Sequence, residues 1–201
     1  MTVVEDIKRS IAKSKTGKIF FMKSFHQYDE EYVGKVLSDL CKQNELVRLS
    51  LGVYLKPMRS KFGVVYPSVF EVVEAIAKRD NAKILPSGNT ALNFLGFSTQ
   101  VAMNSEYITS GSARELKIGK RTVKLKRSVP RNFAYKNELL AVLVQALKAI
   151  GEKNVRAEHL SIVEQLLRKN KEKAISKQDL QLAPAWIRKI IVMQQKRVYN
   201  E

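Results

Sequence analysis

Apolar residues between positions 30 and 42 recur at spacings of three and four, which is the period of an amphipathic helix. The positions that would share one buried stripe are Val33, Val36, Leu37, Leu40 and Cys41. The opposite face is polar, and Asp29 precedes the helix as a candidate N-cap. We therefore predict a helix over residues 30–42 with one buried and one solvated side.

Short elements precede this helix. Residues 3–14 have the apolar spacing of a first helix, and residues 19–21 form a short apolar run that predicts a strand. Residues 24–27 predict one helical turn, and Tyr28 and Asp29 form the connection to the next helix. This order is typical of a helix-turn-helix whose second helix recognises DNA.

A hairpin is predicted after the helix. Residues 46–49 and 53–55 are apolar runs, and Gly52 between them can adopt a positive φ in the turn. Arg48 and Lys56 flank this wing. A helix sized for a major groove beside a basic hairpin predicts a DNA-binding winged helix-turn-helix. A winged helix used for protein contacts is the alternative reading.

A capping box marks the start of the C-terminal half. Ser68 is a good N-cap with Glu71 three residues later, so a helix is expected there. A short strand is expected at residues 84–85, and Ser87 or Gly88 begins another helix.

From residue 107 the period changes to two. Strands are expected at residues 107–109, 116–118 and 123–125, and apolar residues alternate with lysines in the last two. The remainder is helical, with expected helices at about 139–150, 156–169 and 176–182 and from Pro184 onwards.

These elements predict an α+β fold. An N-terminal winged helix-turn-helix would occupy residues 1–58, and residues 59–66 would be a linker. Residues 67–201 would form a mixed α/β C-terminal domain with a basic β-hairpin and C-terminal helices.

Charge indicates the class of partner. Among 201 residues there are 36 Lys and Arg against 19 Asp and Glu, which gives a net charge of +17. Such an excess favours a polyanion, most simply nucleic acid. The lone Cys41 is expected to be a core residue and not a reactive thiol. With no signal peptide and no long apolar span, we expect a cytoplasmic protein without membrane contact.

The residues expected to contact DNA belong to the helix-turn-helix and the wing: Gln27, Tyr28, Tyr32, Lys35, Arg48 and Lys56. Lys35 is the first choice for a base-edge or phosphate contact, because it lies on the outer face of the helix. Glu30 and Glu31 suit the helix dipole but would repel phosphates.

A second basic surface is expected on the C-terminal hairpin and the segment after it. Its members are Lys117, Lys120, Arg121, Lys124, Lys126, Arg127 and Arg131. Residues 116–137 contain no acidic residue. Charge runs are usually solvated faces, and that reading stands beside the hypothesis of a second polyanion-binding surface.

Candidate catalytic chemistry is sparse. Glu115 and Lys117 form an E-x-K pair with Asp80 upstream, a layout of metal-dependent nucleases in which carboxylates hold Mg²⁺. The pair also arises by chance in a chain rich in Lys and Glu. We expect no enzyme and no catalytic residue.

Candidate ligand-binding motifs are also weak. His26 and His159 lack metal-ligand spacing to Cys41, so neither a metal nor a cofactor is expected. Ser87 and Gly88 begin a helix without the lysine of a phosphate-binding loop, which favours a structural helix start over an anion site.

Five stretches resemble a known family: GKIFFMKSF, RLSLGVYLKP, AIAKRDNAKILPSGNTALNFLGFSTQVAMNSEYITSG, QALKAIG and LAPAWIRKII. Together they resemble the AbiEi-like antitoxins of type IV, abortive-infection toxin–antitoxin systems, over almost the whole chain. The wing motif alone is common to many winged helices, whereas the block from Pro86 to Gly111 is more specific.

The resemblance implies two roles. The winged helix would bind the promoter of its own operon and repress it, and the C-terminal domain would supply most of the antitoxin activity. The functional partner would be a nucleotidyltransferase-like toxin, opposed without a stable complex. A monomer or weak dimer is expected. An RNA-binding or ribosome-associated module without a toxin partner is the alternative, since Phe133 and Tyr135 lie within the basic run.

Overall fold

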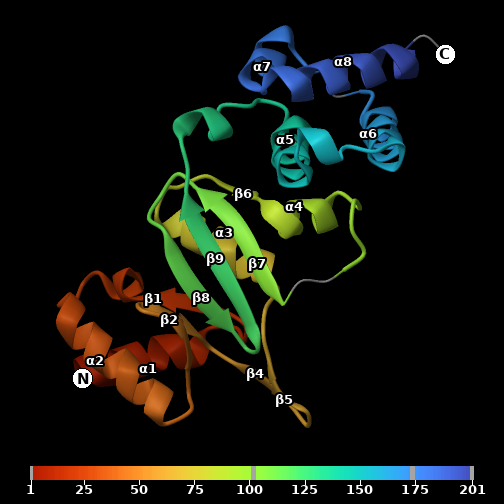
Figure 1. Cartoon of the computed structure of the whole chain (residues 1–201). Coiled ribbons are helices and arrows are strands. Elements are labelled where there is room, and N and C mark those ends of the chain that lie inside the picture. Colours follow the sequence, from red (N-terminus) through yellow and green to blue (C-terminus); the bar gives the residue numbers. More distant parts are fainter. Residues whose placement is uncertain (1, 101–102, 173–174, 200–201) are drawn as a thin grey trace. The chain divides into compact units, whose positions relative to one another are not determined.

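The computed structural model describes residues 2–100, 103–172 and 175–199 and has an α+β fold (Figure 1). Its described residues form eight α-helices and three sheets, with strand orders β1-β3-β2, β4-β5 and β6-β7-β9-β8. The chain divides into two compact units. Unit 1 contains residues 1–76 and 115–122, and unit 2 contains residues 77–114 and 123–201.

Unit 1 begins with two helices around a short strand, as predicted. Helix α1 (Val3–Lys13) starts at a capping box between Thr2 and Glu5. The elements that follow are strand β1 (Ile19–Phe21), the 3₁₀ helix η1 (Met22–Phe25) and helix α2 (Glu30–Lys42). The expected helical turn at residues 24–27 therefore lies slightly earlier, because the Ser24 hydroxyl accepts a hydrogen bond from the N–H of Phe21 and fixes the start of η1.

Strands β2 (Val47–Ser50) and β3 (Val53–Leu55) form the predicted hairpin, and β1 pairs with the other edge of β3. Gly52 in the turn has φ 69°, a conformation that glycine adopts without strain. The core between the helices and this sheet is apolar, and it contains Ile7, Ile11, Phe20, Phe25, Val33, Val36, Leu37, Leu40, Leu46 and Tyr54.

The expected linker at residues 59–66 is not irregular. Strands β4 (Met58–Ser60) and β5 (Gly63–Val65) form a two-stranded hairpin there. Its side chains are exposed or half-buried, so no apolar alternation reveals it in the sequence. The first boundary between the two units lies after residue 76, whereas the sequence predicted a linker at residues 59–66. Residues 115–122 also belong to unit 1.

The division between the units falls within helix α3 (Val69–Arg79), whose capping box pairs Ser68 with Glu71 as predicted. The next elements are strand β6 (Ile84–Pro86), helix α4 (Gly88–Phe94) and strands β7 (Asn104–Thr109), β8 (Arg114–Ile118) and β9 (Arg121–Arg127). Each was expected, although β7, β8 and β9 are all longer than the predicted strands.

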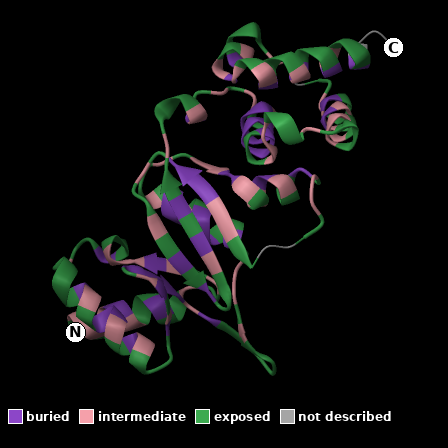
Figure 2. Cartoon of the chain, viewed as in Figure 1, coloured by how far each residue is buried: buried purple, intermediate pink, exposed green. Residues whose placement is uncertain are grey.

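The rest of unit 2 is helical, as predicted. It consists of η2 (Pro130–Phe133), α5 (Glu138–Ile150), η3 (Glu152–Asn154), α6 (Ala157–Lys169), α7 (Lys177–Leu182) and α8 (Ala185–Tyr199). Helix α5 is buried on all sides from Leu140 to Leu147 (Figure 2). It shares one hydrophobic cluster with residues of α4, α6 and α8. Among the described residues, no helix has both the length and the apolar character needed to cross a bilayer.

Candidate nucleic-acid interface

Helix α2 presents one solvent-facing side because its other side is fully used by the core. The Asp29 carboxylate accepts a hydrogen bond of 2.9 Å from the N–H of Tyr32 and fixes the start of the helix. Val33 and Leu37 are completely buried. Tyr32 and Lys35 are exposed one turn apart on the outer side, where both can reach a ligand.

The charges on that outer side are paired within the helix. The Lys35 ammonium lies 2.8 Å from the Glu31 carboxylate, and Lys42 lies 2.8 Å from Asp39. All four side chains are well exposed, so each pair contributes little stability and exchanges readily for another partner. The side is close to neutral in the free protein, which suits base-edge contact better than phosphate contact.

The turn before α2 contains two of the candidate residues, Gln27 and Tyr28. Gln27 is exposed. The Tyr28 hydroxyl donates a 2.6 Å hydrogen bond to Asp6 of α1, and this bond raises the pKa of Tyr28 above its usual value. Tyr28 therefore ties the turn to α1, and its hydroxyl is occupied.

The wing contributes one exposed cation. Arg48 lies on β2 opposite Tyr54 of β3. Burial raises the pKa of Tyr54 above its usual value, and the positive charge of Arg48 offsets part of this shift. Leu51, at the tip of the turn, is 78% exposed.

Lys56 has a different role from the one predicted. Its ammonium donates three hydrogen bonds, of 2.9, 2.8 and 2.7 Å, to the carbonyls of Ile11, Ala12 and Ser14. These carbonyls close α1, where a helix leaves its last carbonyl groups without partners. All three donors of the ammonium are used, so Lys56 is a helix cap and we no longer assign it to phosphate.

The predicted basic hairpin, formed by β8 and β9, has one apolar face and one basic face, as expected. Leu116 and Ile118 of β8 and Val123 and Leu125 of β9 are buried. The cations between and after them are exposed: Lys117, Lys120, Arg121, Lys124, Lys126 and Arg127. Lys126 forms an ion pair of 2.9 Å with Glu106 of β7. The remaining surface is a strand face dense in positive charge.

Arg131 is also exposed, but its guanidinium is engaged by backbone carbonyls. Its guanidinium donates to the carbonyls of Leu182, at 3.0 Å, and Gln181, at 3.1 Å, at the end of α7. Burial and the nearby charge of Arg131 lower the pKa of Lys148. Arg131 therefore joins η2 to α7, and its prediction as a polyanion contact is replaced by this structural role.

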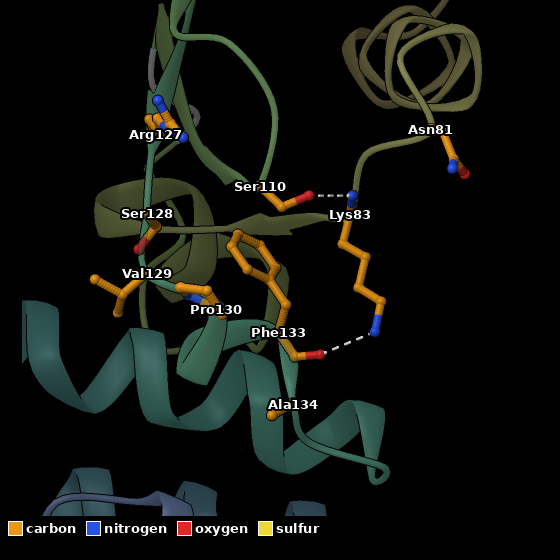
Figure 3. A pocket seen from close by; sticks show the side chains of 9 residues that line it. All are labelled: Asn81, Lys83, Ser110, Arg127, Ser128, Val129, Pro130, Phe133 and Ala134. Atoms are coloured by element: carbon orange, nitrogen blue, oxygen red, sulfur yellow. Dashed lines mark hydrogen bonds between the residues drawn. The ribbon is translucent and has the colours of Figure 1, made fainter.

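A hollow of about 880 Å³ lies in unit 2 at the base of β9 (Figure 3). Its lining combines apolar side chains with polar and basic ones, and it is formed by Asn81, Lys83, Ser110, Arg127, Ser128, Val129, Pro130, Phe133 and Ala134. The Lys83 ammonium donates to the carbonyl of Phe133 at 3.1 Å, and the Lys83 N–H donates to the Ser110 hydroxyl at 2.9 Å. Sequence reasoning missed Lys83, since it lies in a connection without periodicity.

Asp80, the upstream acid of the candidate nuclease layout, is held by two arginines. Both carboxylate oxygens of Asp80 are engaged by arginines, at 2.7 Å from Arg79 and 2.9 Å from Arg114. Within the described ranges, no group of three or more His, Cys, Asp or Glu side chains is placed to hold a metal ion. His159 accepts a 3.1 Å hydrogen bond from the N–H of Arg156 at the start of α6, so it serves as a cap.

One protein family matches most of the chain. It is described as "Family of unknown function (DUF6088)", and the match covers residues 6–175. The chain belongs to this family. No curated protein matches the sequence.

The positive charge of this DUF6088 chain is unevenly distributed. Residues 1–76 contain 12 Lys and Arg against 9 Asp and Glu, whereas residues 77–201 contain 24 against 10. The stretch that carries the helix-turn-helix pattern is thus almost balanced. Any strong general attraction to polyanions comes from the rest of the chain.

Proposed function

We propose that the chain is a DNA-binding repressor of its own operon and the antitoxin of a type IV toxin–antitoxin system. In this proposal residues 1–58 act as a winged helix-turn-helix. One observation carries the DNA-binding part. Helix α2 has a capped start and an outer side on which Tyr32 and Lys35 are exposed, and it is followed directly by a hairpin with an exposed arginine.

The contacts follow from that arrangement. Tyr32 and Lys35 would reach base edges from α2, Gln27 would assist from the preceding turn, and Arg48 would hold the wing to a phosphate. The Glu31 ion pair of Lys35 is exposed, so a base or phosphate can replace the carboxylate at little cost.

The antitoxin part rests on the resemblance to AbiEi-like antitoxins. It implies a cytoplasmic protein, monomeric or weakly dimeric, that opposes a nucleotidyltransferase-like toxin without a stable complex. The dense positive charge of residues 77–201 supports a mechanism in which this part binds the nucleic acid on which the toxin acts. Shared binding of one polyanion explains antagonism without direct contact.

The test is a titration of the full chain against the DNA upstream of its own gene, with excess competitor DNA and two salt concentrations. Specific binding that survives competitor and is weakened about tenfold by Lys35→Ala is the expected result. Lys42→Ala is the matched control, because this lysine forms an equivalent exposed ion pair at the far end of the same helix. Binding that disappears under competitor would refute specific repression, because a basic chain binds any DNA at low salt.

A second function, RNA binding without a toxin, is favoured by one observation. The hollow in unit 2 combines Lys83 and Arg127 with the ring of Phe133, a combination suited to single-stranded nucleic acid. A single-stranded RNA that outcompetes upstream DNA, with affinity lost in Arg127→Ala but kept in Lys35→Ala, would establish this function instead. A neighbouring gene for a nucleotidyltransferase-like protein would support the antitoxin reading.

A further inference from the structure

The β4–β5 hairpin leaves three apolar side chains exposed to different extents. Phe62, in the turn, is 89% exposed, and Met58 and Val65 on the two strands are 46% and 38% exposed. All three residues of β4 are exposed, and in β5 only Val64 is half-buried (Figure 2). The hairpin is therefore not folded around a core of its own.

The hairpin is nevertheless well defined. The Ser60 hydroxyl accepts a hydrogen bond from the N–H of Phe62 and donates one to the carbonyl of Gly63, both at 3.2 Å. Gly63 has φ 112°, which a residue with a side chain would adopt only under strain. Arg59 donates to the carbonyl of Asn44 at the end of α2 and so anchors β4 to unit 1. These bonds fix a turn whose outermost group is an aromatic ring.

An isolated two-stranded hairpin is marginally stable in water, so one that keeps its apolar residues exposed gains stability when a partner covers them. The local charge indicates which partner. Residues 46–70 contain no acidic residue. Of their four cations, Lys56 and Arg59 donate to backbone carbonyls, whereas Arg48 and Lys61 are exposed and remain for a partner. The Lys61 ammonium lies 5.2 Å from the centre of the Phe62 ring, which places an exposed cation beside the exposed aromatic ring.

A second copy of the chain fits this surface poorly. In a symmetric pairing of two such hairpins, the same cations would face each other without a carboxylate on either strand pair. A nucleic acid satisfies both features, because phosphates attract the lysine and a base step accepts the ring.

We infer that the β4–β5 hairpin is a second DNA-contacting element, in which Lys61 binds a phosphate and Phe62 inserts against a base step from the minor groove. Apolar side chains inserted in this way unstack the step and kink the duplex. This inference rests on the proposed DNA-binding function and extends it beyond α2 and the β2–β3 wing.

The experiment compares the full-length chain with its Phe62→Ala, Phe62→Leu and Lys61→Ala variants on the upstream DNA. Phe62→Ala should weaken binding by about tenfold and leave the salt dependence unchanged, because only an uncharged contact is removed. Phe62→Leu should retain most of the affinity, since a leucine side chain can also insert between stacked bases. Lys61→Ala should lower the slope of log affinity against log salt by about 0.9.

Permanganate reactivity of thymines gives an independent readout. The wild-type chain should make at least one thymine reactive by unstacking it, and Phe62→Ala should abolish that signal. Phe94→Ala is the matched control, because Phe94 is also an exposed phenylalanine, 66% exposed, but lies on α4. It should change neither readout.

The outcomes separate this inference from the proposed function. Specific DNA binding by the wild type that Phe62→Ala leaves intact would overturn the inference alone. Absence of specific binding by the wild type would overturn both. A wild-type dimer in sedimentation that Phe62→Ala converts to a monomer, with DNA affinity unchanged, would assign the hairpin to self-association instead.

Discussion

Replacing Lys56 by methionine tests whether this residue is a helix cap or a DNA contact. The variant keeps an apolar stem of similar length but removes the ammonium that binds the carbonyls of Ile11, Ala12 and Ser14. Hydrogen bonds from charged groups are each worth up to roughly 1.5–3 kcal/mol when buried. Here water can reach the end of α1 once the ammonium is gone, so we expect a total loss of about 2 kcal/mol.

For a chain of this size, that loss corresponds to a decrease in Tm of roughly 4–8 °C, measured by far-ultraviolet circular dichroism. Hydrogen exchange should also accelerate at the amides in the last turn of α1, which the released carbonyls no longer restrain. Lys15→Met is the matched control. It removes the same charge from an exposed position just after α1, and its Tm should stay within about 1 °C of the wild type.

The same variant is informative in DNA titrations. Lys56→Met should leave the salt slope of binding unchanged, whereas Arg48→Met on the wing should lower the slope by about 0.9, the value for one lost phosphate contact. An unchanged Tm combined with a lower salt slope for Lys56→Met would refute our assignment, because it would show that the ammonium binds phosphate and not the helix.

Three further predictions concern the rest of the fold. Asp179 is buried, and its carboxylate accepts backbone hydrogen bonds of 3.0 and 2.9 Å at the start of α5. In urea titrations, Asp179→Ala should therefore lower the free energy of unfolding by about 3 kcal/mol. A loss below about 1 kcal/mol would contradict this prediction. Gln194 is completely buried, and neither side-chain amide atom has a hydrogen-bond partner among the described residues. Gln194→Leu should therefore raise Tm by a few degrees, which corresponds to about 1 kcal/mol of added stability. A decrease in Tm would mean that the amide is hydrogen-bonded to a group such as bound water. The raised pKa of Tyr28 means that the folded state favours the protonated phenol, so its bond to Asp6 stabilises the fold at neutral pH and is lost as the pH rises through that raised pKa. The stability difference between wild type and Tyr28→Phe should therefore shrink at strongly alkaline pH, and a constant difference would argue against the bond.

Elements with a buried face were predictable from the sequence. The stripe of α2, the alternation in β8 and β9 and the apolar run of α5 each follow the geometry of one regular element, and burial makes that geometry visible as a period. The capping residues Asp29 and Ser68 were found for a related reason, since their partners lie only three residues away.

The hairpin formed by β4 and β5 was not predictable in the same way. Neither strand buries a face, so no alternation is imposed on its side chains. Its turn depends on Ser60 and on the positive φ of Gly63, which are local signals that also occur in irregular linkers.

The hydrogen bonds of Lys56 and Arg131 to helix carbonyls were not predicted from the sequence, for a physical reason. Both side chains are long cations, and such groups serve equally well on a solvated surface or against the carbonyl end of a helix. The acceptors of Arg131 lie 50 and 51 positions further along the chain, so only the folded structure identifies them. Lys83 was missed for the same reason, since its acceptor at Phe133 is 50 positions away.

The enclosure of α5 has a consequence for the order in which the chain folds during synthesis. The apolar cluster around α5 includes Ile187, Ile191 and Val198 of α8, which are translated about forty residues after α5 itself. The described members of the N-terminal core all precede residue 55 and are available much earlier. A nascent chain can therefore assemble its first core while α5, the most apolar helix, is still without part of its cluster. During that interval the nascent chain exposes apolar surface of α5 that α8 later covers, and slowing translation upstream of α8 would lengthen it.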